Sequence, residues 1–573
     1  MNLRSRSTRG EQFAPNTIDD TGRGRGPHAV AVQARGDMAP AKLGTRRPRP
    51  PMADDNAYPV PPTEVEKYSY LGSSQHRWFF LLQVVAFIGV AVSLVGFSTM
   101  RYWTLIFLVP LMVYAAETLL GLRTSTYARV VTLPDHQMRV ELWKPPVYPS
   151  VDVYLPTCGE DLALLTNTYH WVRKLQWPGE LKVYVLDDAS RPEVAMLAEL
   201  YGFAYLARTG SAFKKAGNLQ HAFERTTGDH ILLLDADFVP RSELLLEVIP
   251  YMDIDDVGIV QTPQFFGTPK SMNWLQRGAG ATQELFYRMI QPSRDRVGAA
   301  ICVGTSAVYR RAAIAAAGGF PQVGHSEDVY TGLAIAKHGY RLQYVPIIVS
   351  KGICPADINS FISQQYRWCE GSMELVRLVE FHSDEKMTRP QRLSYWSGIT
   401  YYLSTAMNGF FSPLPALVMI WLLPELVGPQ NMIPLLGVVL LWLVVYPVVM
   451  KGRWRLDCLR VQAIYSFAHV AAIHDVFFGK VAAWVPSNGT ARPNPVAVRV
   501  RRVMGWYLLS TQVAVVGGLL WQISRFGWSH WWATAAFVVM NLYIFVPVVA
   551  AAFGSSRAYS LAPTRTQPTP AHL

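Results

Sequence analysis

The segment HILLLDAD, His230–Asp237, places a run of apolar residues directly before two carboxylates. A short, continuously apolar run of this kind is typical of a strand buried on both faces of a parallel sheet. Similar runs occur at residues 151–155, 182–186 and 258–261. Amphipathic segments, such as 162–175 and 192–201, alternate with these runs. The sequence therefore predicts an α/β sheet of the doubly wound kind.

Carboxylates follow two of the predicted strands. In open α/β sheets ligands bind beyond the carboxyl ends of the strands, and Asp187 and Asp188 directly follow residues 182–186. They suit hydrogen bonds to a nucleotide base or ribose; the alternative is that an Asp at this turn caps the next helix. Asp235 and Asp237 are oxygen ligands two residues apart, which suits a Mg²⁺ ion that also holds substrate phosphates.

Two further candidate sites follow in the chain. Asp328, in Ser326-Glu327-Asp328, is a candidate general base that accepts a proton from an attacking hydroxyl group; the alternative is an acid that favours a helix N-terminus. In the segment QQYRW, residues 364–368, the planar fork of Arg367 suits diphosphate oxygens and Gln364 offers further hydrogen bonds. Trp368 offers a flat apolar face to a sugar ring. The alternative is an aromatic and basic patch at a membrane interface.

Apolar segments flank the predicted α/β region. Two runs, 78–98 and 102–122, precede it, and four follow at 395–423, 433–450, 504–523 and 531–553. Each approximates the ~20 residues of a spanning helix, so the sequence predicts about six spans. Residues 356–392 and 461–478 are predicted to form helices in the membrane interface. The distribution of Arg and Lys places the α/β domain and both termini in the cytosol.

Composition agrees with a membrane protein. Half of the 573 residues are hydrophobic and only 16% are charged, whereas roughly a quarter are charged in a typical soluble chain. The net charge is +12, and residues 1–50 hold nine Arg and one Lys against four acids. This basic tail is predicted to be a disordered arm, with contact to anionic lipid as the alternative. The chain has no nucleic-acid-binding signature, and its five cysteines form no CxxC pair.

The order of these motifs resembles the cellulose synthase branch of the family 2 processive glycosyltransferases. The shared segments are DDAS, KKAGNLQHAF, LDADF, QTPQFF, GTSAVYRR, SED and QQYRW, which together extend over roughly residues 150–370. The resemblance implies a GT-A (Rossmann-like) fold in the cytosol between transmembrane helices. It also implies a UDP-sugar substrate, a divalent metal such as Mg²⁺ or Mn²⁺, and an inverting single displacement.

Matching the motifs residue by residue extends the resemblance to individual side chains. Asp328 would be the catalytic base, and Asp235 and Asp237 would hold the metal. Trp368 and Thr305 would contact the acceptor. The residues implied to bind the nucleotide sugar are Thr157, Glu160, Asp187, Asp188, Lys215, Asp235, Gln364 and Arg367. Three positions depart from the usual pattern: Ser326 stands in place of Thr, Gln365 in place of Arg, and Val303 in place of Cys.

The resemblance predicts the organisation of the whole chain. The predicted parts are a basic tail over residues 1–70, a transmembrane hairpin over 71–125, a glycosyltransferase domain over 126–355, interfacial helices over 356–394, a channel region over 395–555 with a gating-loop candidate at 481–496, and a tail over 556–573.

The predicted activity is processive synthesis of a β-linked glycan from a UDP-sugar, with UDP-glucose favoured, and export of the product across the plasma membrane. An accessory subunit outside the cytosol is a further implied partner. Three alternatives stay open: a chitin- or hyaluronan-like synthase that uses UDP-N-acetylglucosamine, a non-processive transferase with a lipid acceptor, and a transporter or receptor with a soluble insert.

Overall fold

A computed structural model describes residues 58–72, 76–269, 271–450, 454–479 and 494–554. Its centre is a seven-stranded sheet with the order β3-β2-β1-β4-β7-β6-β8, beside a pair β5-β9. The strands are β1 (Val151–Thr157), β2 (Leu181–Asp187), β3 (Ala204–Ala207), β4 (His230–Leu233), β5 (Val239–Pro240), β6 (Val257–Gln261), β7 (Ala307–Arg310), β8 (Arg341–Tyr344) and β9 (Ser350–Lys351).

All four predicted strands are present in this sheet, as β1, β2, β4 and β6. The strand β1 pairs in parallel with both β2 and β4. The sheet is nevertheless mixed, because β7 lies between β4 and β6 and is antiparallel to both. It is therefore a GT-A-like mixed α/β sheet, and the expected run of parallel strands is interrupted by one reversed strand.

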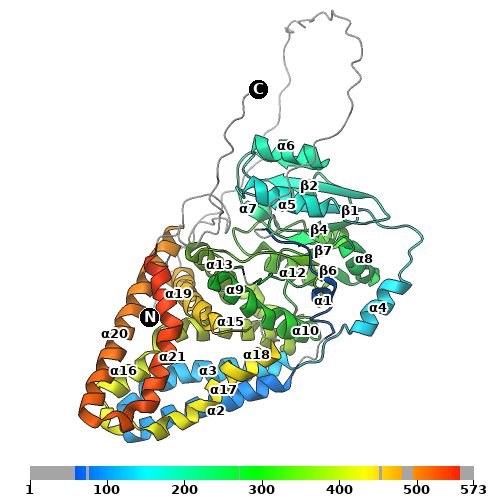
Figure 1. Ribbon diagram of the computed structural model, residues 1–573. Coiled ribbons are helices and arrows are strands. Elements are labelled where there is room, and N and C mark those ends of the chain that lie inside the picture. The colour runs from blue at the N-terminus through cyan, green and yellow to red at the C-terminus, as the bar shows by residue number, and fades with distance from the viewer. Residues whose placement is uncertain (1–57, 73–75, 270, 451–453, 480–493, 555–573) are drawn as a thin grey trace, which may run out of the picture. The chain divides into compact units, whose positions relative to one another are not determined.

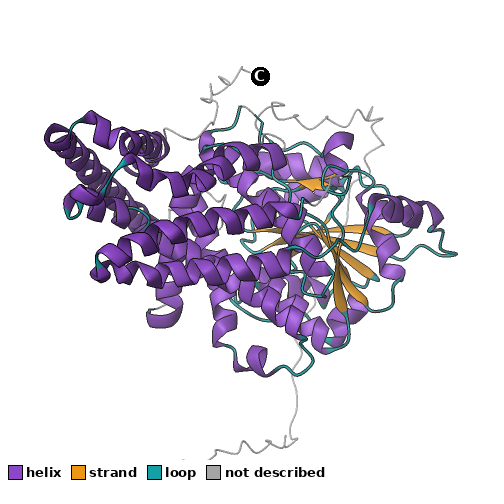
Figure 2. Ribbon diagram, turned by 90° about the horizontal axis from the view of Figure 1, so that it is seen from below, coloured by secondary structure: helices purple, strands orange, loops and turns teal. Residues whose placement is uncertain are grey.

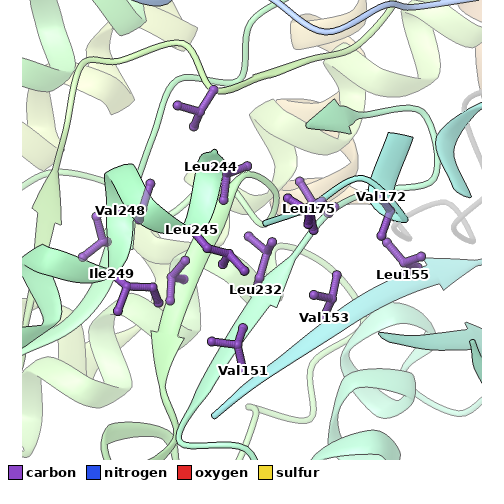
Figure 3. Packing of buried hydrophobic residues seen from close by; sticks show 14 of the residues in the cluster. Val151, Val153, Leu155, Val172, Leu175, Leu232, Leu244, Leu245, Val248 and Ile249 are labelled. Carbon is purple, nitrogen blue, oxygen red and sulfur yellow. The ribbon is translucent and has the colours of Figure 1, made fainter. Parts of the chain in front are cut away.

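Both faces of the sheet are covered by apolar side chains. Successive residues of a strand point to opposite faces, so Val151, Val153 and Leu155 belong to one buried cluster and Tyr154 to another. Figure 3 shows the first cluster, in which Leu155 lies near Val172 at the end of α5 and Val153 and Val151 follow along the strand away from it. The helices of this region are α4 (Leu133–Leu142), α5 (Leu162–Val172), α6 (Pro192–Tyr201), α7 (Lys214–Phe223), α8 (Leu244–Val248), the 3₁₀ turn η2 (Ile249–Asp253), α9 (Trp274–Leu285), the π-helical turn η3 (Phe286–Ile290), α10 (Gln291–Asp295), α11 (Arg311–Ala316) and α12 (Glu327–Lys337).

The folded part of the chain begins earlier than predicted. Residues 58–70, which the sequence assigned to the tail, include the short helix α1 (Glu64–Lys67). Lys67 is buried and pairs with Glu247, while Tyr70 and Leu71 are about 3% exposed. These few anchoring side chains attach the segment to the sheet domain, although the composition of residues 1–70 as a whole is that of a disordered chain.

Among the described residues, seven helical segments are long and apolar enough to cross a membrane. Figure 2 shows the strands gathered in one region, apart from most of these long helices. The segments are α2 (Trp78–Met100); η1 (Tyr102–Phe107) with α3 (Leu108–Ser125); α15 (Arg389–Phe411) with α16 (Leu414–Trp421); η5 (Pro429–Leu435), α17 (Leu436–Leu440), η6 (Leu441–Val445) and α18 (Tyr446–Val449); α19 (Asp457–Phe478); α20 (Pro495–Phe526); and α21 (Trp528–Phe553). The short turn η4 (Pro424–Leu426) precedes η5.

The sequence predicted six spans, and the additional segment is α19, which includes the predicted interfacial helix 461–478. In its most apolar stretch 56% of residues are buried inside the protein, compared with 17% in α2 and α3. It packs against α9, α13 (Ile358–Arg377), α15, α20 and α21. Protein rather than solvent or lipid therefore surrounds more than half of α19, and its placement in the membrane interface stays a prediction. Most of the gating-loop candidate, residues 481–493, lies outside the described residues.

The helix that carries QQYRW connects the sheet domain with the long helices. Asp357 caps the N-terminus of α13 through hydrogen bonds from the backbone N–H groups of Asn359 and Ser360. The helix contacts α19, α20 and α15, and the short helix α14 (Val379–Ser383) follows it. Figure 1 shows α13 beside α9 and α19. One helix therefore contacts several segments that are apolar enough to span a membrane.

Candidate active site

A cavity of about 230 Å³ lies at the carboxyl ends of β1, β2 and β4, between the sheet domain and α13. Ten of the twelve predicted site residues line it: Thr157, Glu160, Asp188, Lys215, Asp235, Asp237, Asp328, Gln364, Arg367 and Trp368. The strand-end carboxylates, Asp187 to Asp237, lie between 127 and 181 residues before the QQYRW segment in the chain. The fold thus brings the separate motifs together at a single site.

Asp187 is one of the two predicted residues that do not line the cavity. It is fully buried, and its carboxylate accepts hydrogen bonds from the backbone N–H groups of Ala189 and Arg191 and from the Tyr205 hydroxyl group. These bonds hold the turn after β2, but Asp187 does not cap the next helix, because the N-cap of α6 is Arg191 and has no side-chain cap bond. Asp188 does line the cavity, and it accepts a hydrogen bond of 2.6 Å from Arg208 Nε. The two neighbouring carboxylates therefore have different surroundings.

Thr305 is the second predicted residue outside the cavity lining. Its side chain is fully buried, and its Oγ1 accepts a hydrogen bond from the backbone N–H of Asp235 at 2.9 Å. Thr305 therefore holds the backbone of Asp235, a residue whose carboxylate lies at a strand end, without lining the cavity itself. The structure places it as support for Asp235 rather than at the acceptor.

Residues 157–160 form a loop that is held by hydrogen bonds among its own residues. Glu160 Oε2 accepts hydrogen bonds from Thr157 Oγ1 at 2.5 Å and from the Cys158 backbone N–H at 2.6 Å. Arg191 donates to Thr157 Oγ1 and to the Glu160 carbonyl oxygen. These bonds hold one wall of the cavity in a single conformation.

Lys215 joins three parts of the site. Its Nζ donates to Asp235 Oδ1 at 2.6 Å and to the Gly304 carbonyl oxygen at 2.8 Å, and it lies 3.6 Å from Glu327 Oε1. The carboxylates of Asp235 and Glu327 raise the pKa of Lys215 against the opposing effect of burial. Lys215 is therefore a fixed cation that links β4, the loop before β7 and the base motif.

The charges of the cavity fit a divalent cation held together with a diphosphate. Among the described lining residues, six carboxyl groups face only three Lys and Arg side chains. Burial, followed by the charges of Asp235 and Glu160, raises the pKa of Asp237 to about 7. Within the described residues no three His, Cys, Asp or Glu groups are arranged as a metal site. Mg²⁺ in proteins is commonly held by one or two carboxylates together with substrate oxygens, and Asp235 and Asp237, which line the cavity, are the candidate carboxylates.

Asp328 lies at the start of α12, where the predicted base is half-buried and lines the cavity. Burial and the neighbouring Glu327 raise its pKa to about 7, and the nearby Lys215 moderates this rise. One of its oxygens accepts a hydrogen bond from the Val329 backbone N–H. A carboxyl group with this pKa is close to the value that suits a general base at neutral pH.

The segment QQYRW has two different faces on α13. Gln364, Arg367 and Trp368 are separated by three and four residues, share one helical face and line the cavity. Tyr366 and Cys369 are buried on the opposite side with residues of α15 and α19. Gln365 is 5% exposed and does not line the cavity. The departure from the usual motif therefore falls outside the cavity lining.

Several cavity residues were not singled out as site residues from the sequence. Lys214, Phe213, Gln264 and His325 are among the lining side chains. Lys214 adjoins Lys215, and His325 directly precedes Ser326-Glu327-Asp328, so proximity to a motif was the available signal. Gln264 belongs to the shared segment QTPQFF, so membership of that segment was the available signal.

The mixed sheet, with its acidic groups at the strand ends, defines a GT-A-like domain of the glycosyltransferase class. Residues 230–450 match the family described as Glycosyl transferase family group 2. The chain is 34% identical over 279 residues to a cellulose synthase 1 catalytic subunit, UDP-forming, from Komagataeibacter xylinus, a match that covers 48% of this chain and 36% of that protein. It is 31% identical over 289 residues to a cellulose synthase catalytic subunit from Pseudomonas fluorescens, covering 49% of this chain and 38% of that protein.

Residues 230–450 therefore match the family 2 glycosyltransferases, and about half of the chain is related at 31–34% identity to bacterial cellulose synthase catalytic subunits. The matches span little more than a third of the length of those relatives. Among solved structures, a mannosyltransferase from Pyrobaculum calidifontis in complex with GDP-Man and Mn²⁺ aligns with 70% of this chain and all of that chain, at 17% identity and a TM-score of 0.45.

Proposed function

We propose that this protein is a membrane-embedded, inverting, processive glycosyltransferase. It would polymerise UDP-glucose at the cytosolic face of the plasma membrane into a β-linked, cellulose-like glycan and pass the product across the membrane. The observation that carries the proposal is the double role of α13. One face of this helix lines the cavity beside the carboxylates, and the other packs on α15 and α19.

The arrangement supports a single displacement. An acceptor hydroxyl group attacks the anomeric carbon of the donor sugar, its proton passes to the Asp328 carboxylate, and the bond to the UDP oxygen breaks. Attack opposite the leaving group inverts the configuration, so an α-linked donor gives a β-linkage. Arg367 and Lys215 offer positive charge to the departing diphosphate. A divalent cation, when bound at Asp235 and Asp237, neutralises part of the charge that develops on UDP.

Processivity needs the product to stay bound after each transfer. Trp368 lies on the cavity face of α13, where a flat aromatic surface suits the terminal sugar of a growing chain. The same helix contacts α15, α19 and α20. A glycan that leaves the cavity past Trp368 would therefore meet helices that are apolar enough to lie in a membrane. This continuity supports secretion of the product rather than release into the cytosol.

The test uses the purified full chain in detergent or lipid nanodiscs with Mg²⁺ or Mn²⁺. UDP-glucose, UDP-N-acetylglucosamine and other UDP-sugars are offered separately, and UDP release and product size are measured. The proposal predicts UDP release with UDP-glucose and a high-mass glycan that is cleaved by a β-1,4-glucanase. A single sugar transferred to lipid would contradict processivity, and a product formed only from UDP-N-acetylglucosamine would contradict the donor.

A further inference from the structure

The loop that carries the catalytic base, residues 324–328, lies against the residues that directly follow QQYRW on α13. Ser326 has a left-handed backbone conformation with φ of 53°, which turns its side chain toward Gly371. A methyl group placed on Gly371 would overlap Ser326 Oγ and lie 2.6 Å from Ser326 Cβ. Rotation of the hydroxyl group could relieve the first overlap but not the second. Only glycine at position 371 therefore allows the loop to approach α13 this closely.

Two polar contacts flank this close approach. On one side, His325 Nε2 lies 3.5 Å from Glu370 Oε1. On the other side, the Tyr330 hydroxyl group donates to Glu374 Oε2 at 3.4 Å. The three contacts run in the same order along both chain segments. The pairs are His325 with Glu370, Ser326 with Gly371, and Tyr330 with Glu374. These six residues form the base-loop seam.

Glu370 is an unusual component of the seam. It is fully buried, and neither of its carboxylate oxygens has a hydrogen-bond partner among the described residues. Leaving such a group buried is costly unless nearby charge compensates it. The Arg367 guanidinium, three residues earlier on α13, offsets part of this cost, while burial and the Glu374 carboxylate raise the pKa of Glu370 to about 8. His325 lies beside Glu370 as a polar neighbour, because burial lowers the pKa of its imidazole. Glu370 thus lies where the base loop and the cavity face of α13 meet.

We propose that Glu370 and Gly371 are positioning residues that dock the base loop onto α13 and so hold Asp328 opposite the cavity face of that helix. The active motif then extends two residues beyond Cys369, to include Glu370 and Gly371. Neither residue lines the cavity, so their effect on transfer acts through the loop. The catalytic consequence rests on the proposed function, whereas the docking itself does not.

The central test is a rescue by a second substitution. Gly371→Ala forces the loop away from the helix, and a displacement of about 1 Å at a reacting group can cost on the order of 100-fold in rate. We therefore expect kcat for UDP release to fall about 100-fold while the Kd for UDP changes by less than about threefold. Ser326→Gly removes both overlapping atoms and leaves the Ser326 Cα at an ordinary 4.0 Å from the new methyl group. The double variant should recover most of the rate of the Ser326→Gly single variant.

The matched control is Ser326→Ala, which removes the hydroxyl group but keeps the Cβ at 2.6 Å from the new methyl group. Combined with Gly371→Ala it should give little recovery. A Gly371→Ala variant within about twofold of wild type, or equal recovery by both Ser326 variants, would overturn the proposal. Glu370→Gln, which keeps the size of the side chain and a polar group beside His325, should retain more activity than Glu370→Ala; equal losses would count against the role of Glu370.

Hydrogen exchange of residues 324–328 provides a readout that does not require turnover. Exchange should accelerate in Gly371→Ala and return toward that of the Ser326→Gly single variant in the Gly371→Ala/Ser326→Gly double variant. If the wild type releases no UDP from any nucleotide sugar, the proposed function fails, yet exchange still tests the docking. Unchanged exchange in Gly371→Ala would overturn the docking itself. If Gly371→Ala does not fold, the same exchange comparison between Glu370→Ala and Glu370→Gln decides the outcome.

Discussion

The two faces of α13 differ in what surrounds them. Gln364, Arg367 and Trp368 line a polar cavity that holds six carboxyl groups. Tyr366, from the same motif, and Cys369, which directly follows it, are buried against α15 and α19. A compact sequence motif therefore has two environments: one face borders the cavity, and the other packs on helices that are apolar enough to span a membrane. Substitutions on the two faces should therefore fail in different ways.

The largest effect is expected at the base that faces this helix across the cavity. Asp328→Asn keeps the shape of the side chain but cannot accept the acceptor proton. Loss of a general base typically costs about 10²–10⁴-fold, so kcat should fall by about 1,000-fold while UDP affinity is nearly retained. UDP release and UDP binding by calorimetry provide the two measurements. Turnover close to that of wild type would remove Asp328 from this role.

Substitution of Arg367 should cause the next largest loss of activity, and substitution of Gln365 is the control. Arg367→Ala removes a charge-assisted donor to diphosphate and should lower kcat/KM for the UDP-sugar by about 100-fold. Gln365→Ala, which alters a residue outside the cavity lining, should leave the KM for the UDP-sugar within about threefold. Equal increases in KM for the two variants would mean that the faces are not functionally distinct.

The pH dependence of activity tests how Glu327 affects the pKa of Asp328. Burial and Glu327 raise the pKa of Asp328 to about 7, and only the ionised carboxylate accepts a proton. Activity should therefore fall as the pH drops below 7, approaching about tenfold per pH unit. Glu327→Gln removes the repelling charge, lowers the pKa of Asp328 and should move the midpoint of kcat/KM to lower pH. The metal concentration is held fixed, and an unmoved midpoint would contradict this electrostatic link.

Trp368 should affect elongation rather than donor binding. Trp368→Ala removes the flat surface for the acceptor and should shorten the product and slow elongation by about tenfold, since stacking of this type contributes roughly 1–2 kcal/mol. Trp368→Phe, which keeps a smaller flat face, should retain more of both. Product size and UDP affinity are measured together. An equal loss of elongation and UDP affinity in Trp368→Ala would argue against acceptor stacking.

The smallest catalytic effect is expected on the face that packs against α19. The Tyr366 hydroxyl group donates to Asp475 Oδ2 at 3.0 Å, and Asp475 is only 5% exposed. Tyr366→Phe should destabilise the protein by about 1–3 kcal/mol, because it takes a hydrogen bond from a buried carboxylate. The melting temperature should fall while UDP affinity of the folded protein stays unchanged. A loss of UDP affinity without a loss of stability would reverse the assignment of the two faces.

Local patterns predicted much of the fold. The apolar runs located β1, β2, β4 and β6, because strands buried on both faces need continuous apolar side chains. The reversed strand β7 was not predicted, since Ala307–Arg310 is short and its direction depends on pairing with distant strands. The sequence also did not predict that residues 58–72 are folded. Only a few of these residues make anchoring contacts, and the composition of the surrounding region is typical of a disordered chain.

The placement of candidate site residues at the cavity could be predicted where the side-chain direction followed from helical spacing. Gln364, Arg367 and Trp368 share a face by their spacing alone. Asp187 and Asp188 are adjacent and chemically identical, so the sequence could not tell which one the turn would bury. The contact of Gly371 with Ser326 joins residues 45 positions apart in the sequence, and it became visible only when the two segments were placed in space.

A cryo-EM structure of the full chain with UDP and Mn²⁺ would test the two faces of α13 together. We expect the diphosphate beside Gln364 and Arg367, a metal at Asp235 and Asp237, and Tyr366 still bonded to Asp475 on the opposite face of α13. A nucleotide bound away from the 364–368 cavity face, with these side chains unengaged, would contradict the central claim.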